Sequence, residues 1–445
     1  MASVVPRRRK LSSFRIVILG FAGLICLGTI LLMLPISSRY GIPTSFGSAL
    51  FTATSATCVT GLVVRDTATH WSVFGQIVIL TMIQIGGLGV IMAVAAFSLI
   101  SGRKISLKER SMMKDAFATQ RMRGVVRMGI FVFSTTFAIE LIGAILMMPS
   151  FCKQYGLRGI WISCFLSISA FCNAGFDILG HSDSLFPSLS AFATNPVICL
   201  TICALIVVGG IGFTTWSDIQ TNKLRFKRYS LQSKIILSMS AFLITAPALF
   251  FYFFEYESLP SLERVLASLF QSITTRTAGF NVEDMSVMTE PGQALTIILM
   301  LIGGSPGSTA GGIKTTTLAV LLANFMAVSL RRNEANLFKR RIEDEAIKQA
   351  GAIITMYVSL SLVGATALCL IEELPYLACL FECVSALGTV GITLGITPHL
   401  HVASRIILII FMFLGRVGGL TVIYAATKDY KKSHAKLPHE YVTVG

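Results

Sequence analysis

Residues 54–62, TSATCVTGL, form the first of four short segments that end in a glycine after a run of small and hydroxyl-bearing residues. The other three are SAFCNAGF at 169–176, TTRTAGF at 274–280 and ALGTVGI at 386–392. We call the four segments the glycine turns. Their glycines stand roughly 110 residues apart, which is the mark of a chain built from repeated units: Gly61, Gly175, Gly279 and Gly391. A second glycine follows each turn at a similar interval: Gly86, Gly209, Gly303 and Gly415.

The composition is that of a membrane protein. Apolar residues make up 54% of the 445 residues, charged residues 13%, and the mean hydropathy is +0.74. These values exclude a soluble globular protein, and no polar linker divides the chain, so we expect one continuous membrane domain. The basic residues 7–10 precede a long apolar run without a small-residue cleavage site, which predicts an uncleaved first span.

Eight apolar stretches are long enough to cross a hydrocarbon core of about 30 Å, which takes roughly 20 helical residues. They cover residues 14–35, 72–101, 126–148, 195–218, 232–254, 292–328, 349–371 and 402–426. Between paired stretches lie semi-polar segments that are too short to cross, at 46–60, 159–173, 262–277 and 376–390. We therefore predict an all-α integral membrane protein with eight transmembrane helices and four re-entrant pore helices.

This pattern divides the chain into four units of helix, pore loop and helix around a central pore. Repeat 1 covers 12–101, repeat 2 covers 123–220, repeat 3 covers 230–330 and repeat 4 covers 346–428, followed by a cytoplasmic tail at 429–445. Lys and Arg gather at both termini and between the repeats, and such segments stay in the cytoplasm. We expect parallel repeats in the plasma membrane with both termini inside. Topology and attraction to anionic membrane lipid then explain the net charge of +15, without nucleic-acid binding.

The glycine turns have the composition of an ion filter. Glycine adopts positive φ without steric cost, so the residues ahead of it can turn their carbonyl oxygens toward a shared axis. A ring of such oxygens replaces the hydration shell of an alkali cation, and the ends of the pore helices add partial negative charge. The predicted ion-binding residues are Cys58, Val59, Thr60, Gly61, Cys172, Asn173, Ala174, Gly175, Arg276, Thr277, Ala278, Gly279, Gly388, Thr389, Val390 and Gly391.

Acidic residues follow three of the turns and predict an outer mouth that concentrates cations: Asp66, Asp177, Glu283 and Asp284. A different interpretation is that the glycines only allow tight helix packing, as small residues do in many membrane proteins. Four glycines in register, each followed by a second glycine at a similar interval, favour the filter.

Residues 301–317, LIGGSPGSTAGGIKTTT, cannot continue the second helix of repeat 3, because Pro306 and the surrounding glycines break it. At membrane depth such irregular backbone survives only where it lines water or is buried in protein. A phosphate-binding loop is excluded, since the spacing around Lys314 does not fit and no strand precedes it.

These motifs resemble the Trk/Ktr/HKT superfamily of potassium transporters, and over nearly the whole chain they are most similar to the membrane subunit of Ktr systems. The resemblance implies potassium uptake through a four-repeat selectivity filter, with potassium the only metal bound there. Glycine at all four filter positions goes with potassium selectivity, whereas serine at the first loosens it toward sodium. Cys58 stands where threonine is common.

The resemblance also implies that residues 303–313 form an intramembrane gating loop. The predicted gating residues are Gly303, Gly304, Ser305, Gly307, Ser308, Gly311, Gly312, Lys314 and Arg416. It further implies a homodimer docked on a separate cytoplasmic ring of RCK (KTN) subunits that bind nucleotide. We expect no cofactor in this chain, and sodium stays open as a coupling or regulatory ion.

Two arginines inside apolar stretches need a partner or a purpose, because a bare charge at bilayer depth costs on the order of several kcal/mol. We interpret Arg276 as a buried strut to a carboxylate such as Glu382 or Glu140. Arg416 follows Gly415 on the second helix of repeat 4 and is expected to face the pore just below the filter, as a barrier to cations.

Other classes of function fit less well. Paired pocket carboxylates, a catalytic triad and a metal-binding cluster are all missing from the sequence pattern, so we do not expect an enzyme. A sodium-permeable uniporter of the same fold and a membrane receptor or scaffold stay as alternatives, to be separated by ion flux in liposomes.

Overall fold

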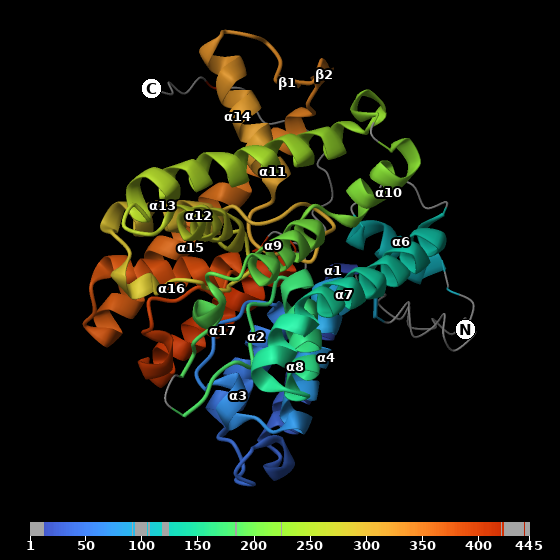
Figure 1. Cartoon of the computed structure of the whole chain (residues 1–445). Helices are drawn as coiled ribbons and strands as arrows, with labels where there is room; N and C mark the ends of the chain where they lie inside the picture. The colour runs from blue at the N-terminus through green and yellow to red at the C-terminus, as the bar shows by residue number, and fades with distance from the viewer. Residues whose placement is uncertain are drawn as a thin grey trace, which may run out of the picture.

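The computed structural model describes residues 13–90, 92–93, 105, 107–117, 124–182, 185–223, 225–419, 421 and 440. Within them the secondary-structure elements are all helices apart from one small hairpin, β1 (Asn336–Leu337) and β2 (Arg340–Arg341), and loops connect them (Figure 1). The predicted tail at 429–445, apart from residue 440, lies outside the described residues.

Four described helices are long and apolar enough to cross a membrane, and each is the first helix of a repeat. They are α1 (Ser13–Met33), α7 (Val125–Tyr155), α11 (Leu231–Phe250) with its π-helical extension η4 (Phe251–Glu255), and α15 (Asp344–Glu372).

Short helices lie where the sequence predicts pore helices. They are α2 (Phe46–Cys58), α8 (Arg158–Phe171), α12 (Ser261–Thr274) and α16 (Tyr376–Gly388). Each ends within its glycine turn, three to five residues before the ring glycine, because the backbone there leaves the helical conformation. The remaining short elements are α3 (Thr67–His70), α6 (Leu107–Ala116), η1 (Pro35–Ser37), η2 (Ser190–Phe192), η3 (Phe226–Arg228), η5 (Met285–Val287) and η6 (Thr397–His399).

The second helices of the repeats are shorter than predicted. They are α4 (Val73–Leu88), α9 (Pro196–Gly210), α13 (Glu290–Leu301) and α17 (Val402–Val417). The prediction of one continuous span at 195–218 is wrong, since the chain bends by 96° between α9 and α10 (Phe213–Asn222). Only if this bent pair counts as one span does the described part have a fifth crossing.

A glycine with positive φ explains these early ends. Gly89, Gly212 and Gly418 come after the paired glycines, or after Gly-Arg in repeat 4, and have φ near +90°, which ends a helix. The predicted spans 72–101 and 402–426 therefore stop as helices at Leu88 and Val417, and most of their remaining residues lie outside the described part of the chain. The break at 303–313 is confirmed, because α14 (Thr315–Ser329) begins only after it.

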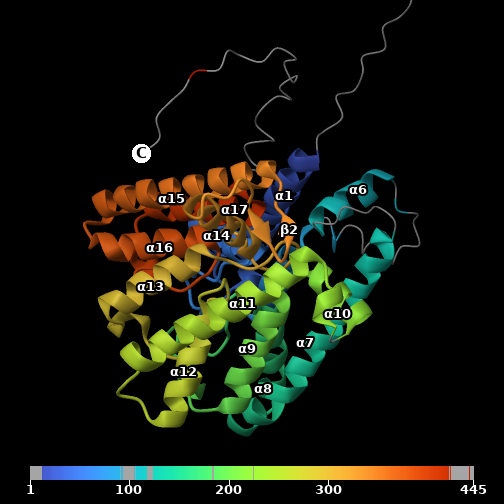
Figure 2. The ribbon, with the colours of Figure 1, turned by 90° about the horizontal axis from the view of Figure 1, so that it is seen from above.

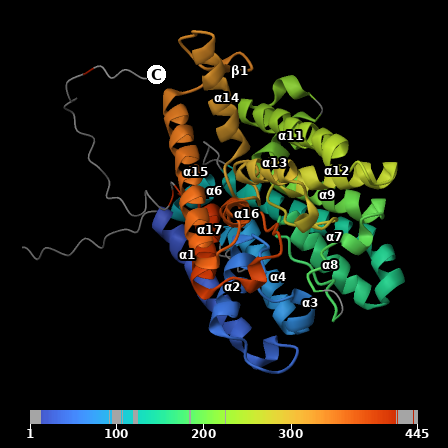
Figure 3. The ribbon, with the colours of Figure 1, turned by 90° about the vertical axis from the view of Figure 1, so that its left-hand side faces the viewer.

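The repeats contact one another in a closed cyclic order. Each pore helix packs against the second helix of the preceding repeat: α8 against α4, α12 against α9, α16 against α13, and α2 against α17. Figures 2 and 3 show the four differently coloured repeats about a common centre. The four glycine turns are thereby brought to the middle of the molecule.

The second glycine of three repeats allows the pore helix to approach closely. A Cβ on Gly86, Gly209 or Gly415 would collide with the carbonyl oxygen four residues ahead of the glycine in that repeat's own turn: Thr57, Phe171 and Leu387. Glycine is required here because the backbones touch. The similar interval between the two glycines in these repeats is thus explained by this contact. Repeat 3 differs, since Gly303 lies against the Gly311 carbonyl.

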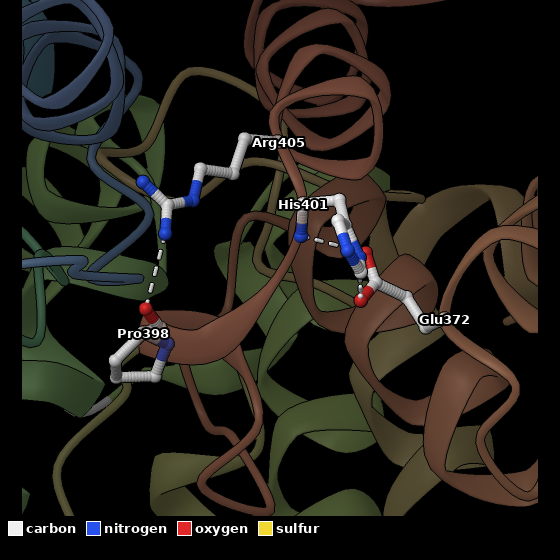
Figure 4. A network of polar contacts seen from close by, with 4 residues as sticks. All are labelled: Glu372, Pro398, His401 and Arg405. Atoms are coloured by element: carbon white, nitrogen blue, oxygen red, sulfur yellow. Dashed lines mark hydrogen bonds and ion pairs between the residues drawn. The ribbon is translucent and has the colours of Figure 1, made fainter.

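In repeats 3 and 4 a glutamate at the end of the first helix bonds the start of the second helix. Glu255 accepts hydrogen bonds from the Thr289 backbone N–H at 2.8 Å and hydroxyl at 2.6 Å. Glu372 likewise accepts from the His401 backbone N–H at 2.8 Å and lies 2.9 Å from His401 Nδ1, while Arg405 donates to the Pro398 carbonyl at 3.1 Å (Figure 4). Thr289 and His401 directly precede α13 and α17, so the carboxylates cap these helices.

We expect Gly86→Ala to lower the free energy of unfolding by about 2 kcal/mol or more, because the added methyl group forces α4 away from α2. The measurement is the apparent melting temperature of the purified protein in detergent. Gly23→Ala is the matched control: Gly23 lies in α1 and its Cβ position has no neighbour within 4 Å. Equal melting temperatures for the two variants would contradict the close-contact explanation.

Candidate functional site

The backbone adopts the same unusual conformation in all four glycine turns. The glycines have positive φ of 97°, 67°, 84° and 90°, at Gly61, Gly175, Gly279 and Gly391. Two residues earlier, a residue with a side chain is also left-handed, with φ of 58°, 59°, 70° and 53°, at Val59, Asn173, Thr277 and Thr389. Three of these four are β-branched, for which this conformation is costly and is retained only under strong constraint.

The four glycines form a closed ring. A Cβ on each would lie no more than 2.7 Å from the carbonyl oxygen just before the glycine of the next repeat. Gly61 faces Ala174, Gly175 faces Ala278, Gly279 faces Val390, and Gly391 faces Thr60, which returns to repeat 1. The chain order of the repeats is therefore also their order around the ring.

The ring carbonyls are buried oxygen atoms without a hydrogen-bond partner in the described part of the chain. Thr60, Ala174, Ala278 and Val390 are fully buried, and within the described residues their carbonyls accept no hydrogen bond. A buried carbonyl without a partner costs free energy. Four of them around one axis can instead replace the hydration shell of an alkali cation.

The first residue of each predicted filter set is not in the ring, and in repeats 1, 2 and 4 it lies at the end of a pore helix. Cys58 and Gly388 are the last residues of α2 and α16, and Cys172 caps α8. In repeat 3 the Arg276 carbonyl accepts from Asn173 Nδ2 at 3.4 Å, which joins the turns of repeats 2 and 3.

The expected carboxylate partner of Arg276 is wrong. Its guanidinium is buried and donates to the Ser240 hydroxyl of α11 at 3.2 Å. Glu140 is occupied by Gln84 Nε2 at 3.0 Å, and Glu382 accepts from the Leu394 backbone N–H and from two threonine hydroxyls. Both carboxylates thus find closer donors, and Arg276 remains a buried strut, but to a hydroxyl.

The glycine-rich loop at 303–313 is fixed to the break between α9 and α10. The Ser305 N–H donates to the Gly210 carbonyl at 3.0 Å, and the Thr309 N–H donates to the Gly209 carbonyl at 3.3 Å. In the other direction the Phe213 N–H donates to the Gly307 carbonyl at 2.7 Å. The irregular backbone of repeat 3 is therefore satisfied by irregular backbone of repeat 2.

The same loop lies directly against two glycine turns. The Cβ position of Gly303 is 3.1 Å from the Thr277 methyl group, and that of Gly312 is 3.1 Å from the Gly388 carbonyl. Gly311 contacts the Thr389 side chain so closely that a methyl group would not fit. The loop thus covers one side of the ring.

Arg416 joins the loop to repeat 1. Its guanidinium donates to the carbonyls of Thr309, Gly86 and Gly87, the last at 2.8 Å. Lys314 turns back on its own loop and donates to the carbonyls of Ala310 at 2.7 Å and Gly311 at 3.2 Å. The two cations are held by backbone oxygens at the level of the loop.

Sequence reasoning missed Thr309 and Phe117. The Thr309 hydroxyl donates to the Phe171 carbonyl at 3.2 Å, and its own carbonyl accepts from Arg416. Phe117 is fully buried between the loop and α10, where it meets Phe213 edge-on at 6.2 Å. Thr309 could have been noticed as a polar residue within a glycine-rich run, whereas nothing local marks Phe117.

A cavity of about 280 Å³ lies beside the loop. Its lining includes Gly307, Ser308, Lys314, Arg416 and Phe117, and it includes no residue of the glycine turns. The loop and Arg416 therefore border a cavity that the ring residues do not line.

The acidic residues predicted for the outer mouth have mixed surroundings. Asp66 is buried, and its carboxylate caps α3 and accepts from the Phe186 N–H at 3.1 Å, so it holds two loops together. Asp177 and Asp284 each accept a hydrogen bond from the backbone N–H of the residue two positions later in the chain, at 3.0 and 2.9 Å. Glu283 is partly exposed, and Asp284 is exposed.

Fold and site together define an all-helical, multi-pass membrane transporter. A family model described as "Cation transport protein", TrkH, matches residues 9–435. The chain belongs to this family, which consists of transporters and not of enzymes.

Two curated relatives cover almost the whole chain. The potassium/sodium uptake protein NtpJ of Enterococcus hirae is 39% identical over 98% of both chains. The Ktr system potassium uptake protein B of Bacillus subtilis is 39% identical over 97% of this chain and 96% of its own. The crystal structure of the potassium transporter TrkH from Vibrio parahaemolyticus superposes with a TM-score of 0.74, at 17% identity, over 95% of this chain and 86% of that chain, and supports the fold.

We expect Gly61→Ser to lower the preference for potassium over sodium by about tenfold, because the side chain would displace the Ala174 carbonyl beside it. The measurement is rubidium uptake into proteoliposomes with competing sodium. Gly47→Ser, on α2 with no neighbour within 4 Å of its Cβ position, is the control. An unchanged preference in Gly61→Ser would remove Gly61 from the filter.

Proposed function

We propose that this protein takes up potassium across the plasma membrane through a selectivity filter made by the four glycine turns. The observation that carries the proposal is the closed ring in which each glycine faces the unpartnered carbonyl of the next repeat. Dehydrated potassium finds there the oxygen ligands that it loses with its water. The ion is the substrate, and the chain needs no further cofactor for this step.

The names of the relatives support the choice of ion. The Bacillus subtilis relative is a potassium uptake protein, and the Enterococcus hirae relative is a potassium/sodium uptake protein. Sodium permeation by the same fold is therefore the second candidate. The resemblance to the Trk/Ktr/HKT superfamily, in which glycine at all four ring positions goes with potassium selectivity, favours potassium.

We also propose that the loop at 303–313 and Arg416 gate the path between the filter and the cytoplasm. The loop lies against the turns of repeats 3 and 4, and Arg416 bonds it to repeat 1. A guanidinium about 4 Å from a passing cation opposes it by roughly 4 kcal/mol at an effective dielectric of 20. Opening thus requires both the loop and the charge to move.

The Bacillus subtilis relative is named as part of a Ktr system, which supports an assembly with partner components. We propose a homodimer with eight membrane crossings per chain, both termini in the cytoplasm, and a separate RCK (KTN) ring that binds nucleotide and shifts the loop between closed and open states. Such control requires the ring to bind the two states with different affinity. Basic segments between the repeats then face the ring and the anionic lipid.

Rubidium flux into proteoliposomes containing the purified full chain tests the proposal. We expect uptake that potassium blocks at a concentration at least about tenfold lower than sodium does. Equal block by both ions would favour the sodium-permeable alternative. No flux with or without the ring, from protein that is folded, would overturn the transport proposal.

We expect Arg416→Ala to raise rubidium flux in the absence of the ring about tenfold, since it removes the barrier charge and the anchor of the loop at Thr309. Shortening the loop within 305–311 should raise flux further and blunt the response to nucleotide. Arg405→Ala is the control, because Arg405 lies at the other end of α17 and bonds only the Pro398 carbonyl among the described residues. Low, fully nucleotide-controlled flux in a folded loop variant would place the gate elsewhere.

A further inference from the structure

Each pore helix carries a fully buried hydroxyl in its last turn, a few residues before the ring glycine. Three are serines six residues before the ring glycine, and the fourth is a threonine five residues before it: Ser55, Ser169, Ser385 and Thr274. None of them belongs to the four residues that we assign to the filter in each repeat. All four bond backbone groups at or just beyond the glycine.

The four hydroxyls act in two different ways. Ser55 and Ser385 accept a hydrogen bond from the N–H of the ring glycine, Gly61 or Gly391, at 3.1 Å in both cases. Ser169 and Thr274 instead donate to the carbonyl of the residue after the glycine, Phe176 or Phe280, at 2.7 Å in both cases. Since repeats 4 and 1 are neighbours in the ring, and so are repeats 2 and 3, each half of the ring has its own kind of contact.

The first kind of contact acts directly on a ring carbonyl. The N–H of Gly61 and the carbonyl of Thr60 belong to one planar trans peptide and point in opposite directions. When Ser55 holds the N–H toward the pore helix, the carbonyl must point away from that helix, toward the ring. The same argument joins Ser385, Gly391 and Val390.

The second kind of contact acts two peptides later. Ser169 and Thr274 fix the peptides that follow Phe176 and Phe280, and not the peptides that carry the ring carbonyls of Ala174 and Ala278. Among the described residues, the peptide of the Ala174 carbonyl has no hydrogen bond from its own N–H, that of Gly175. In repeat 3 the Gly279 N–H, in the peptide of the Ala278 carbonyl, donates to the Thr274 backbone carbonyl at 3.4 Å. In both repeats, removal of the hydroxyl therefore leaves the contacts of the ring peptide itself unchanged.

We propose that these four hydroxyls are positioning residues for ion selectivity, and that Ser55 and Ser385 have the larger effect. By fixing the direction of the Thr60 and Val390 carbonyls, they keep half of the ring at the spacing that suits potassium. The proposal rests on the proposed function and names the residues that tune it. A ring with freely rotating carbonyls adapts to a smaller ion and discriminates less.

The test compares two double variants in the rubidium and sodium competition assay. We expect Ser55→Ala with Ser385→Ala to lower the preference for potassium about tenfold, and Ser169→Ala with Thr274→Val to lower it about threefold or less. Ser55→Thr and Ser385→Thr keep the hydroxyl and should retain at least half of the normal preference. Equal losses in both double variants would overturn the difference that we propose.

The matched controls are Ser163→Ala and Ser268→Ala. Both serines are buried on the pore helices α8 and α12, and their hydroxyls bond only helix carbonyls four residues earlier, Gly159 at 2.8 Å and Arg264 at 2.7 Å. These variants also lose a buried hydroxyl, but that hydroxyl makes no hydrogen bond to a glycine turn among the described residues. A loss of selectivity in the controls as large as in Ser55→Ala with Ser385→Ala would overturn the positioning role.

A binding measurement covers variants that transport poorly. The rise in melting temperature that potassium produces in the purified protein, relative to sodium, should shrink in Ser55→Ala and Ser385→Ala and persist in Ser163→Ala. Full potassium-specific stabilisation in both single variants would overturn the inference. If the unaltered protein shows no preference between the ions in either assay, the proposed function itself fails, which distinguishes the two failures.

Discussion

The contact between each ring glycine and the carbonyl ahead of the next one is the constraint on which the rest of the structure depends. It needs a residue without a side chain and with positive φ, so each pore helix has to stop just before it. The stop brings the last helix carbonyls into the interior, where only another glycine can pack on them, and Gly86, Gly209 and Gly415 do so. Helix lengths, helix breaks and the cyclic order of the repeats thus follow from one short contact repeated four times.

The repeated local features were predictable from sequence, because each leaves a signal at fixed spacing. The glycine turns, the pore helices before them and the break at Pro306 all lie where composition and glycine spacing place them. The second helices were predicted too long, because hydropathy continues past Gly89, Gly212 and Gly418 although the backbone does not. The serine six residues before three of the glycines was visible when the repeats are set side by side, but its meaning depends on which backbone group it reaches.

Contacts between repeats could not be predicted in the same way. Arg416 bonds carbonyls of Gly86 and Gly87 some 330 residues earlier in the chain, and no local pattern records such a pair. The predicted carboxylate partner of Arg276 was wrong for a related reason. The sequence does not show which buried acceptor lies near the guanidinium, and in the structure it is the Ser240 hydroxyl of α11. Asp66 was assigned to the mouth by its position after the turn. In the structure it is buried, and its carboxylate accepts hydrogen bonds from backbone N–H groups.

Repeats 3 and 4 depart from the common pattern next to the ring, where the proposed gate lies. In repeats 1 and 2 a further glycine, Gly87 or Gly210, directly follows the second glycine. The Gly87 carbonyl accepts from Arg416, and the Gly210 carbonyl accepts from the Ser305 N–H of the loop. Repeat 4 has Arg416 at the matching position, and repeat 3 has the loop in place of a straight helix. Hydrogen bonds in both directions therefore join the loop to repeat 2, and Arg416 joins both the loop and repeat 1. Because several of these hydrogen bonds share the loop, displacement of the loop breaks them together.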